Sequence, residues 1–366
     1  MRPAALARCA AVAAGAAAIP AWLAAQSLPY DEMAVRIAQA LKIASGERVL
    51  LRLNPDVMPA LEPAARAALE RAGAKVETLG AGPVTDLDAR LARTDVYVWL
   101  PGASAITGAA DRQALTKWVD VGGSRRELHF HWVEGTLRDD GLPAKHTSAY
   151  DRLYLDALKI DYDALDARMD RAAALLRNGE VRVTAPRGTD IRFRVGERPF
   201  NRQNGDGSKE RTSKGRMRID RHVELPAGVM RVAPVEASVT GIMAIASFPI
   251  GDGRATDVRL EFERGRIVNA AAGQGLNALK QLLATPGASE FREFCLGFNP
   301  RLVPPKGDAT VPYYGYGEGV VRMSVGDNEE LGGNVRGGFV RWIFFTDATV
   351  SVNGETLVRN GRLVLQ

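Results

Sequence analysis

The sequence predicts a two-domain chain, in which an α/β domain with a Rossmann-like parallel sheet precedes a strand-rich α+β domain. In the first third of the chain, segments with helical periodicity alternate with short β-rich runs, a pattern typical of right-handed βαβ units. Two helical segments follow, and strand-like segments then predominate. The length of 366 residues also favours two domains, because single domains usually contain roughly 100–200 residues.

The first 25 residues have the composition of a secretory signal peptide. Arg2 and Arg8 precede an Ala-rich apolar run over residues 9–25. This run is shorter than the roughly 20 residues that span a bilayer, and Pro20 interrupts it, which favours a cleaved signal over an anchor. We therefore expect a periplasmic or secreted protein without a transmembrane segment after cleavage near Ala25.

Charge and cysteine content narrow the class of protein. Removal of the two N-terminal arginines would lower the formal net charge from +5 to +3, and so mild a surplus does not indicate a nucleic-acid partner. Cleavage would also remove Cys9 and leave Cys295 as the only thiol, so no internal disulfide is expected. The apolar context Phe294-Cys295-Leu296 favours a buried structural thiol over a nucleophile.

Residues 27–149 are predicted to form the α/β domain. The stretch Gly102-Ala103-Ser104 lies between an expected strand and helix, where backbone N–H groups could bind an anion. It lacks the spaced glycines of a dinucleotide loop and the lysine of a P-loop, so an ordinary turn is favoured. The expected helices are 31–43, 60–72 and 109–119, and the expected strands are 48–53, 75–79, 95–100 and 128–133.

Residues 150–179 are predicted to form a helical connector, and residues 180–366 the α+β domain. Residues 201–215 are rich in Gly, Asn, Ser, Lys and Arg, which predicts a long polar loop. The expected helices are 150–158, 162–177 and 273–283, and the expected strands are 181–185, 191–195, 238–247, 257–263, 265–269, 320–325, 339–345 and 348–352.

A series of short motifs occurs in a fixed order through the second half of the chain. Their order and spacing resemble the thermophilic metallo-aminopeptidase family of the aminopeptidase T and aminopeptidase S type. Residues 46–52 and 154–162 also look like this family, so the resemblance covers most of the chain. The motifs are Gly188-Thr189-Asp190, Leu225-Pro226-Ala227-Gly228, Ala233-Pro234-Val235-Glu236-Ala237-Ser238-Val239-Thr240-Gly241, Leu296-Gly297-Phe298-Asn299-Pro300 and Gly332-Gly333-Asn334.

The resemblance implies a paired-metal site, but most of its ligand positions hold unsuitable residues here. Glu293 matches a ligand glutamate that stands before Gly-x-Asn-Pro, and it is retained. The same superfamily includes iron-dependent dioxygenases that open dihydroxypyridine rings, and their metal triad would fall on Glu293, Arg341 and Ile343. Neither metal chemistry is therefore expected to persist in its usual form. The residues at the other aminopeptidase ligand positions are Val229, Arg322, Arg341 and Ile343.

Ligand counting favours an ion-pair cluster in place of the metals. A hydrolytic metal site needs about three protein ligands and an open position for water. Glu293 alone cannot supply them, and Arg322 and Arg341 would repel a cation. We expect these three residues, with Glu329 near the position of a family tyrosine, to line a cleft that binds a peptide or a small anion. The alternative is that the arginines only form salt bridges with Glu293 and its neighbours.

Other carboxylates in the motif regions could rebuild a metal site. Glu236 belongs to the motif Ala-Pro-x-Glu-x-Ser-Val, and a carboxylate-only site would suit Mg²⁺, Ca²⁺ or Mn²⁺ better than zinc or cobalt. The further candidates are Glu224, Asp327, Glu329 and Glu330.

The histidines give a weaker signal. His129 and His131 are two residues apart on an expected strand, so both side chains would point to one face. This spacing can bind a metal, but the sequence places no third ligand, and a structural pair is favoured. His146 and His222 are isolated in the sequence.

These observations leave three hypotheses. The first is an exported metallopeptidase-family protein with a degenerate metal site, weak or no peptidase activity and a cleft for a peptide or small anion. The second is an active metal-dependent aminopeptidase with a rearranged carboxylate site. The third is a structural or partner-binding protein with a vestigial cleft. We expect no cofactor unless the family's activity persists, in which case it would be a divalent metal. A homodimer is among the assemblies that the sequence permits.

Overall fold

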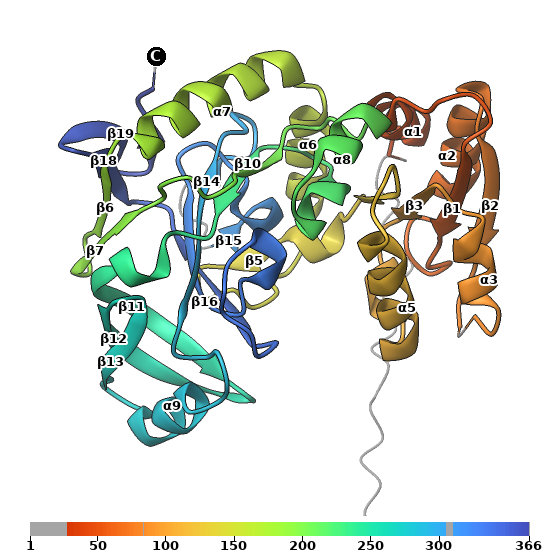
Figure 1. Cartoon of the computed structure of the whole chain (residues 1–366). Coiled ribbons are helices and arrows are strands. Elements are labelled where there is room, and N and C mark those ends of the chain that lie inside the picture. The colour runs from red at the N-terminus through yellow and green to blue at the C-terminus, as the bar shows by residue number, and fades with distance from the viewer. Residues whose placement is uncertain (1–27, 83, 305–309, 366) are drawn as a thin grey trace, which may run out of the picture.

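The computed structural model describes residues 28–82, 84–304 and 310–365 (Figure 1). The predicted signal peptide, residues 1–25, lies outside these ranges. Among the described residues, no helix is long and apolar enough to cross a membrane. In Figure 1 the helix-rich first part of the chain lies on one side of the molecule and the strand-rich later part on the other.

The first part contains a five-stranded parallel sheet. Its order is β2-β1-β3-β4-β9, and every neighbouring pair is parallel. This arrangement confirms the predicted Rossmann-like sheet. The strands are β1 (Arg48–Arg52), β2 (Lys75–Leu79), β3 (Val96–Trp99), β4 (Arg126–His129) and β9 (His222–Glu224).

Helices cover both faces of this sheet, because alternate residues of its strands point to opposite sides. On one face, Val49 and Leu51 of β1 pack in the main core with α1 (Tyr30–Leu41) and α2 (Leu61–Arg71). On the other face, Tyr97 and Trp99 of β3 pack in a second core with α3 (Leu87–Ala92) and α5 (Ala109–Asp120). Burial on both faces explains the nearly continuous apolar runs of β1 and β3. The short helix α4 (Ala103–Ile106) follows β3.

The edge strand β9 comes from a distant part of the chain. It pairs with β4 through Leu128 and Val223, although residue 223 lies beyond the predicted boundary at residue 180. The predicted domain boundary at residue 180 stays a prediction. Strand β9 lies beyond it in the sequence, yet completes the parallel sheet of the first part. This pairing brings residues from both halves to one sheet edge.

Two helices lead into the second part, α6 (Ser148–Leu158) and α7 (Tyr162–Arg177), and α7 runs along the top of the molecule in Figure 1. An antiparallel eight-stranded sheet has the order β13-β12-β11-β7-β6-β18-β19-β20. Its strands are β6 (Glu180–Ala185), β7 (Thr189–Arg194), β11 (Thr240–Ile250), β12 (Gly253–Glu263), β13 (Arg266–Ala271), β18 (Thr349–Val352), β19 (Glu355–Arg359) and β20 (Arg362–Leu363), and α9 (Leu276–Leu283) follows β13.

A second five-stranded sheet has the order β17-β16-β14-β10-β8. Its central strand β14 is buried along its whole length although it contains charged residues. The strand-rich second part confirms the predicted fold class. The strands are β8 (Asn201–Gln203), β10 (Val229–Val232), β14 (Phe291–Gly297), β16 (Val321–Gly326) and β17 (Val340–Phe345), and a small two-stranded sheet joins β5 (Leu137–Arg138) to β15 (Thr310–Val311).

The prediction of a long loop over residues 201–215 was wrong. The segment contains β8 and a short helix, α8 (Lys209–Lys214). Ser208 caps this helix, because its hydroxyl accepts a hydrogen bond from the backbone N–H of Arg211. Asn201 is fully buried and donates its amide to the carbonyl of Ile219. Polar side chains thus order a segment whose composition indicated a loop.

Candidate functional site

Glu293 on β14 is fully buried inside an ion-pair network. Its Oε2 accepts a hydrogen bond from Arg231 Nε at 3.0 Å, while Arg292 Nη1 lies 2.6 Å and Arg322 Nε 3.4 Å from Oε1. The Ser324 hydroxyl also donates to Oε1, at 3.1 Å. Burial alone would raise the pKa of Glu293, but the three guanidinium groups hold it well below its ordinary value. Both carboxylate oxygens therefore already have cationic partners.

Strand register explains how these residues meet. Arg231 of β10 and Arg322 of β16 both pair with Cys295 of β14, so the three form one row across the sheet. Glu293 is two residues from Cys295 and lies on the same face. A register shift between Phe291 and Glu293 places Arg292 at an irregularity of the strand. The sequence did not predict Arg231 and Arg292 as partners of Glu293, because the register between two strands cannot be read from the sequence of either strand alone.

Arg322 has further partners inside the same network. Its Nη1 donates to the carbonyl of Tyr314 at 3.1 Å, its Nη2 lies 3.1 Å from the Cys295 sulfur, and its guanidinium lies 4.9 Å from the Trp342 ring centroid. Cys295 is buried, as expected, and burial raises the pKa of its thiol to about 11. Arg322 is thus a buried structural cation, held by the Tyr314 carbonyl, the Cys295 sulfur and the Trp342 ring besides Glu293.

Arg341 lies apart from this cluster. It stands on β17 opposite Val325, with its guanidinium 6.0 Å from the Phe248 ring centroid. Burial lowers its pKa, with Asp140 as the opposing charge. No contact between Arg341 and Glu293 occurs among the described residues. The structure therefore brings Arg322, but not Arg341, to Glu293.

Two of the carboxylates expected to rebuild a site, Glu236 and Glu329, have arginine partners instead. Glu236 pairs with Arg198 and accepts from the backbone N–H of Asn334 at 3.0 Å. Glu329 pairs with Arg336 at the surface.

Glu330, in the 3₁₀ turn η5 (Glu329–Leu331), belongs to the buried network. It lies 2.9 Å from Arg231 Nη2 and also pairs with Arg292. Burial would raise its pKa, but these arginines lower it to about 2. Glu330 therefore extends the Glu293 network towards the parallel sheet.

The residues at the family's ligand positions do not fit a paired-metal centre. Val229 and Ile343 are buried and apolar, and Arg322 is a cation. The single carboxylate, Glu293, has three arginine partners. A metal there would have to displace these ion pairs and would still lack ligands.

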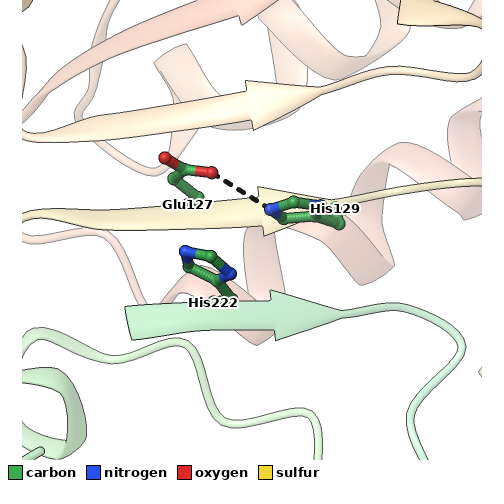
Figure 2. A group of neighbouring side chains, drawn as sticks. All are labelled: Glu127, His129 and His222. Atoms are coloured by element: carbon green, nitrogen blue, oxygen red, sulfur yellow. Dashed lines mark hydrogen bonds and ion pairs between the residues drawn. The ribbon is translucent and has the colours of Figure 1, made fainter. Parts of the chain in front are cut away.

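A second cluster lies at the carboxyl end of the parallel sheet, where β4 and β9 run side by side (Figure 2). Strand pairing sets Glu127 beside His222 and His129 beside Glu224. His129 Nε2 lies 3.1 Å from Glu127 Oε2, and the rings of His129 and His222 stack with centroids 5.1 Å apart. His131, just beyond β4, places Nε2 3.2 Å from His129 Nδ1. Three of the four histidines thus meet at one site.

A cavity of about 350 Å³ opens beside this cluster. His129, His131 and His222 form part of its wall, together with Trp99 and Glu330. Glu330 therefore connects the cavity to the Glu293 network. Arg112 and Arg218 also line the cavity.

The sequence anticipated part of this second site. It placed His129 and His131 on one face, and the structure brings both together. It did not place His222, because only the pairing of β4 with β9 does so. His146 lies elsewhere, 2.9 Å from Asp151 and 2.8 Å from the Thr136 hydroxyl.

Comparison with known proteins confirms the predicted family resemblance. Residues 157–303 match the model of the thermophilic metalloprotease (M29) family. The fold is similar to 2,5-dihydroxypyridine dioxygenase from Pseudomonas putida KT2440, with a TM-score of 0.62, 16% identity, and coverage of 93% of this chain and 98% of that chain. It is also similar to wild-type AmpT from Thermus thermophilus, with a TM-score of 0.61, 18% identity, and coverage of 92% and 99%. No curated protein sequence matches the chain.

Proposed function

We propose that this chain is a metallopeptidase-like protein in which an ion-pair network has replaced the family's metal centre. The observation that carries this proposal is that Arg231, Arg292 and Arg322 all form ion pairs with the buried Glu293. It follows that aminopeptidase activity of the ordinary two-metal kind is weak or absent.

Electrostatics supports this proposal. Near Glu293, three guanidinium groups face two carboxylates, those of Glu293 and Glu330. A divalent cation would therefore enter a region of net positive charge and would also lose water ligands. If Glu293 turned towards a metal, the buried Arg322 would lose its carboxylate partner, and Arg231 and Arg292 would keep only Glu330.

The cavity beside the histidine cluster suits a small polar ligand, although none of the residues expected to line a cleft, Glu293, Arg322, Arg341 and Glu329, lies on its wall. Its volume of about 350 Å³ lies in the size range of small-molecule sites. Arg112 and Arg218 on its wall use one nitrogen each on the Thr107 carbonyl and on Asp120. Their other N–H groups can donate hydrogen bonds to a carboxylate, while Trp99 offers an apolar surface. A short peptide or a small organic anion fits this combination, and it remains the ligand class that we propose.

An active aminopeptidase with a rearranged carboxylate site is less well supported. Glu236, Glu329 and Glu330 all have arginine partners, so their charges are already balanced. We retain export to the periplasm or beyond as a further proposal, supported by the composition of residues 1–25. N-terminal sequencing of the native protein would test it, and an intact Met1 in a cytosolic fraction would contradict it.

Aminoacyl p-nitroanilide hydrolysis tests the proposed function directly. The assay compares wild-type protein with Glu293→Gln in the presence of added Zn²⁺, Co²⁺ or Mn²⁺. We expect no metal-dependent release above background from either protein. Vigorous release by the wild type that is abolished by Glu293→Gln would show that the family site is active.

Ligand binding is tested separately with Ala-Ala dipeptide and inorganic phosphate. Because Trp99 lines the cavity, its fluorescence should change on binding, and Arg218→Ala should weaken the response. Absence of any response to these probes would contradict the proposal that this cavity binds peptides or small anions.

A further inference from the structure

We propose that His129, His131 and Glu224 bind a divalent transition-metal ion, with Zn²⁺ as the expected metal, at the carboxyl end of the parallel sheet. These residues are distinct from the family's ligand positions on β10, β14, β16 and β17. The proposed metal site is therefore independent of the degenerate family site.

Backbone geometry brings the three ligands together. His129 and Glu224 are partners in the pairing of β4 with β9, so their side chains project from neighbouring strands on the same face of the sheet. His131 is two residues after His129 and lies on the same side. One ligand thus comes from each strand, and the third from the loop after β4.

The spacing of the donor atoms fits a small, closely ligated ion. His129 Nδ1 lies 3.2 Å from His131 Nε2 and 3.9 Å from Glu224 Oε1, and the three donor atoms all lie within 4.8 Å of one another. Zinc–nitrogen and zinc–oxygen bonds of about 2.0–2.2 Å in a tetrahedron put ligand atoms roughly 3.4 Å apart. Small rotations of the Glu224 side chain would therefore complete three corners of a tetrahedron.

An unpartnered carboxylate oxygen at the cluster also indicates a missing ligand. Within the described part of the chain, Glu224 Oε2 is buried without a hydrogen-bond partner. His131 Nδ1 is also buried without a partner, but it is the ring nitrogen on the far side from the proposed ligand atom Nε2. His131 is only 9% exposed, and the Glu224 side chain 16%. A buried carboxylate oxygen without a hydrogen bond is costly, and a cation between Glu224 and the two imidazoles would offset this cost.

Neighbouring groups orient His129 as a ligand. Glu127 Oε2 accepts a hydrogen bond from Trp99 Nε1 at 3.1 Å and lies at the same distance from His129 Nε2. With the His129 proton on Nε2, donated to this carboxylate, the lone pair on Nδ1 faces His131 and Glu224. A carboxylate that holds the far nitrogen of a ligand histidine is the usual support of a metal site.

The donor set determines the class of metal and leaves room for a further ligand. Two imidazole nitrogens and one carboxylate suit zinc and related transition metals, whereas Mg²⁺ and Ca²⁺ prefer oxygen ligands alone. His129 and His131 also line the cavity of about 350 Å³, so water or a ligand from the cavity can occupy the remaining position. His222 stacks on His129 but lies outside this ligand group.

Zinc titration calorimetry on the chelator-treated full chain tests the proposal. We expect one Zn²⁺ per wild-type chain, and at least a tenfold weaker affinity for both His131→Ala and the conservative variant Glu224→Gln. Glu293→Gln should bind zinc as the wild type does. Circular dichroism of each variant would establish that it is folded.

Two matched outcomes would overturn the proposal. One is the absence of stoichiometric zinc binding by folded wild-type protein. The other is zinc binding that survives both His131→Ala and Glu224→Gln. If His222→Ala then removed zinc binding, the ion would lie among Glu127, His129 and His222 instead. Loss of zinc only in Glu293→Gln would instead restore the family site and overturn the proposed function as well.

Discussion

Replacing Glu293 with glutamine removes the one negative charge that Arg231, Arg292 and Arg322 share. Glutamine has nearly the same shape, so packing is preserved and the charge is the main change. Its amide NH₂ group would face a guanidinium donor, which exchanges an ion pair for a donor-donor contact. The fully buried position gives water no route to compensate.

The magnitude follows from the cost of breaking a buried ion pair, about 3–5 kcal/mol. Arg231 and Arg292 keep Glu330 as a partner, and Arg322 keeps its hydrogen bond to Tyr314, so we do not expect a larger loss. The entropy of unfolding for 366 residues is roughly 0.8 kcal/mol/K. The expected decrease in Tm is therefore about 4–6 °C.

Differential scanning calorimetry measures this change and resolves separate transitions if the two parts of the chain unfold independently. Glu263→Gln is the matched control, because Glu263 is an exposed glutamate on β12 and its substitution should shift Tm by less than about 1 °C. A Glu293→Gln variant as stable as the wild type, or more stable, would refute the reasoning. It would mean that the arginines do not depend on this carboxylate.

Three further predictions concern the buried carboxylate of Glu47, the reactivity of the Cys295 thiol and the close backbone contact at Gly297. Glu47→Gln should destabilise the fold by about 3–5 kcal/mol in urea unfolding, since it leaves the buried Arg126 without its carboxylate. Burial raises the pKa of Glu47, but its hydrogen bond and ion pair with Arg126 lower it below the ordinary 4.5. The stabilisation is therefore present above pH 4.5 and is lost as pH falls through the lowered pKa. The wild type should for this reason lose more stability in acid than Glu47→Gln does. The Cys295 thiol, with its pKa raised to about 11, should react with a disulfide reagent at pH 8 at least tenfold faster in denaturant than in the native state, and equal rates would contradict its burial. Gly297→Ala should be strongly destabilising in a thermal shift assay, because its Cβ would lie 2.0 Å from the carbonyl oxygen of Gly317; an unchanged Tm would show that this contact relaxes freely.

The fold was largely predictable, because local periodicity reports local structure. Amphipathic helices and apolar strands gave α1, α2, α5 and the strands of the parallel sheet, apart from β9. Strands β10 and β14 were not predicted, since their charged residues interrupt the apolar pattern. Those charges are buried and mutually paired, a condition that depends on tertiary contacts and is invisible to periodicity.

The candidate site was predictable only in part, for the same reason. The family resemblance located both Glu293 and Arg322, and their opposite charges predicted that they would pair. The register of β10 with β14 brings Arg231 to Glu293, and a local irregularity of β14 brings Arg292 there. His222 and Glu224 joined His129 only because β9 returns to the parallel sheet across a long sequence separation.

Anomalous X-ray diffraction from crystals soaked with Zn²⁺ tests the central claim most directly, because it locates metal without reference to activity. We expect no anomalous peak within bonding distance of Glu293, whose oxygens face Arg231, Arg292 and Arg322. The zinc peak should lie among His129, His131 and Glu224. A peak bonded to Glu293, with the arginines displaced, would contradict the claim that ion pairs have replaced the family's metal centre.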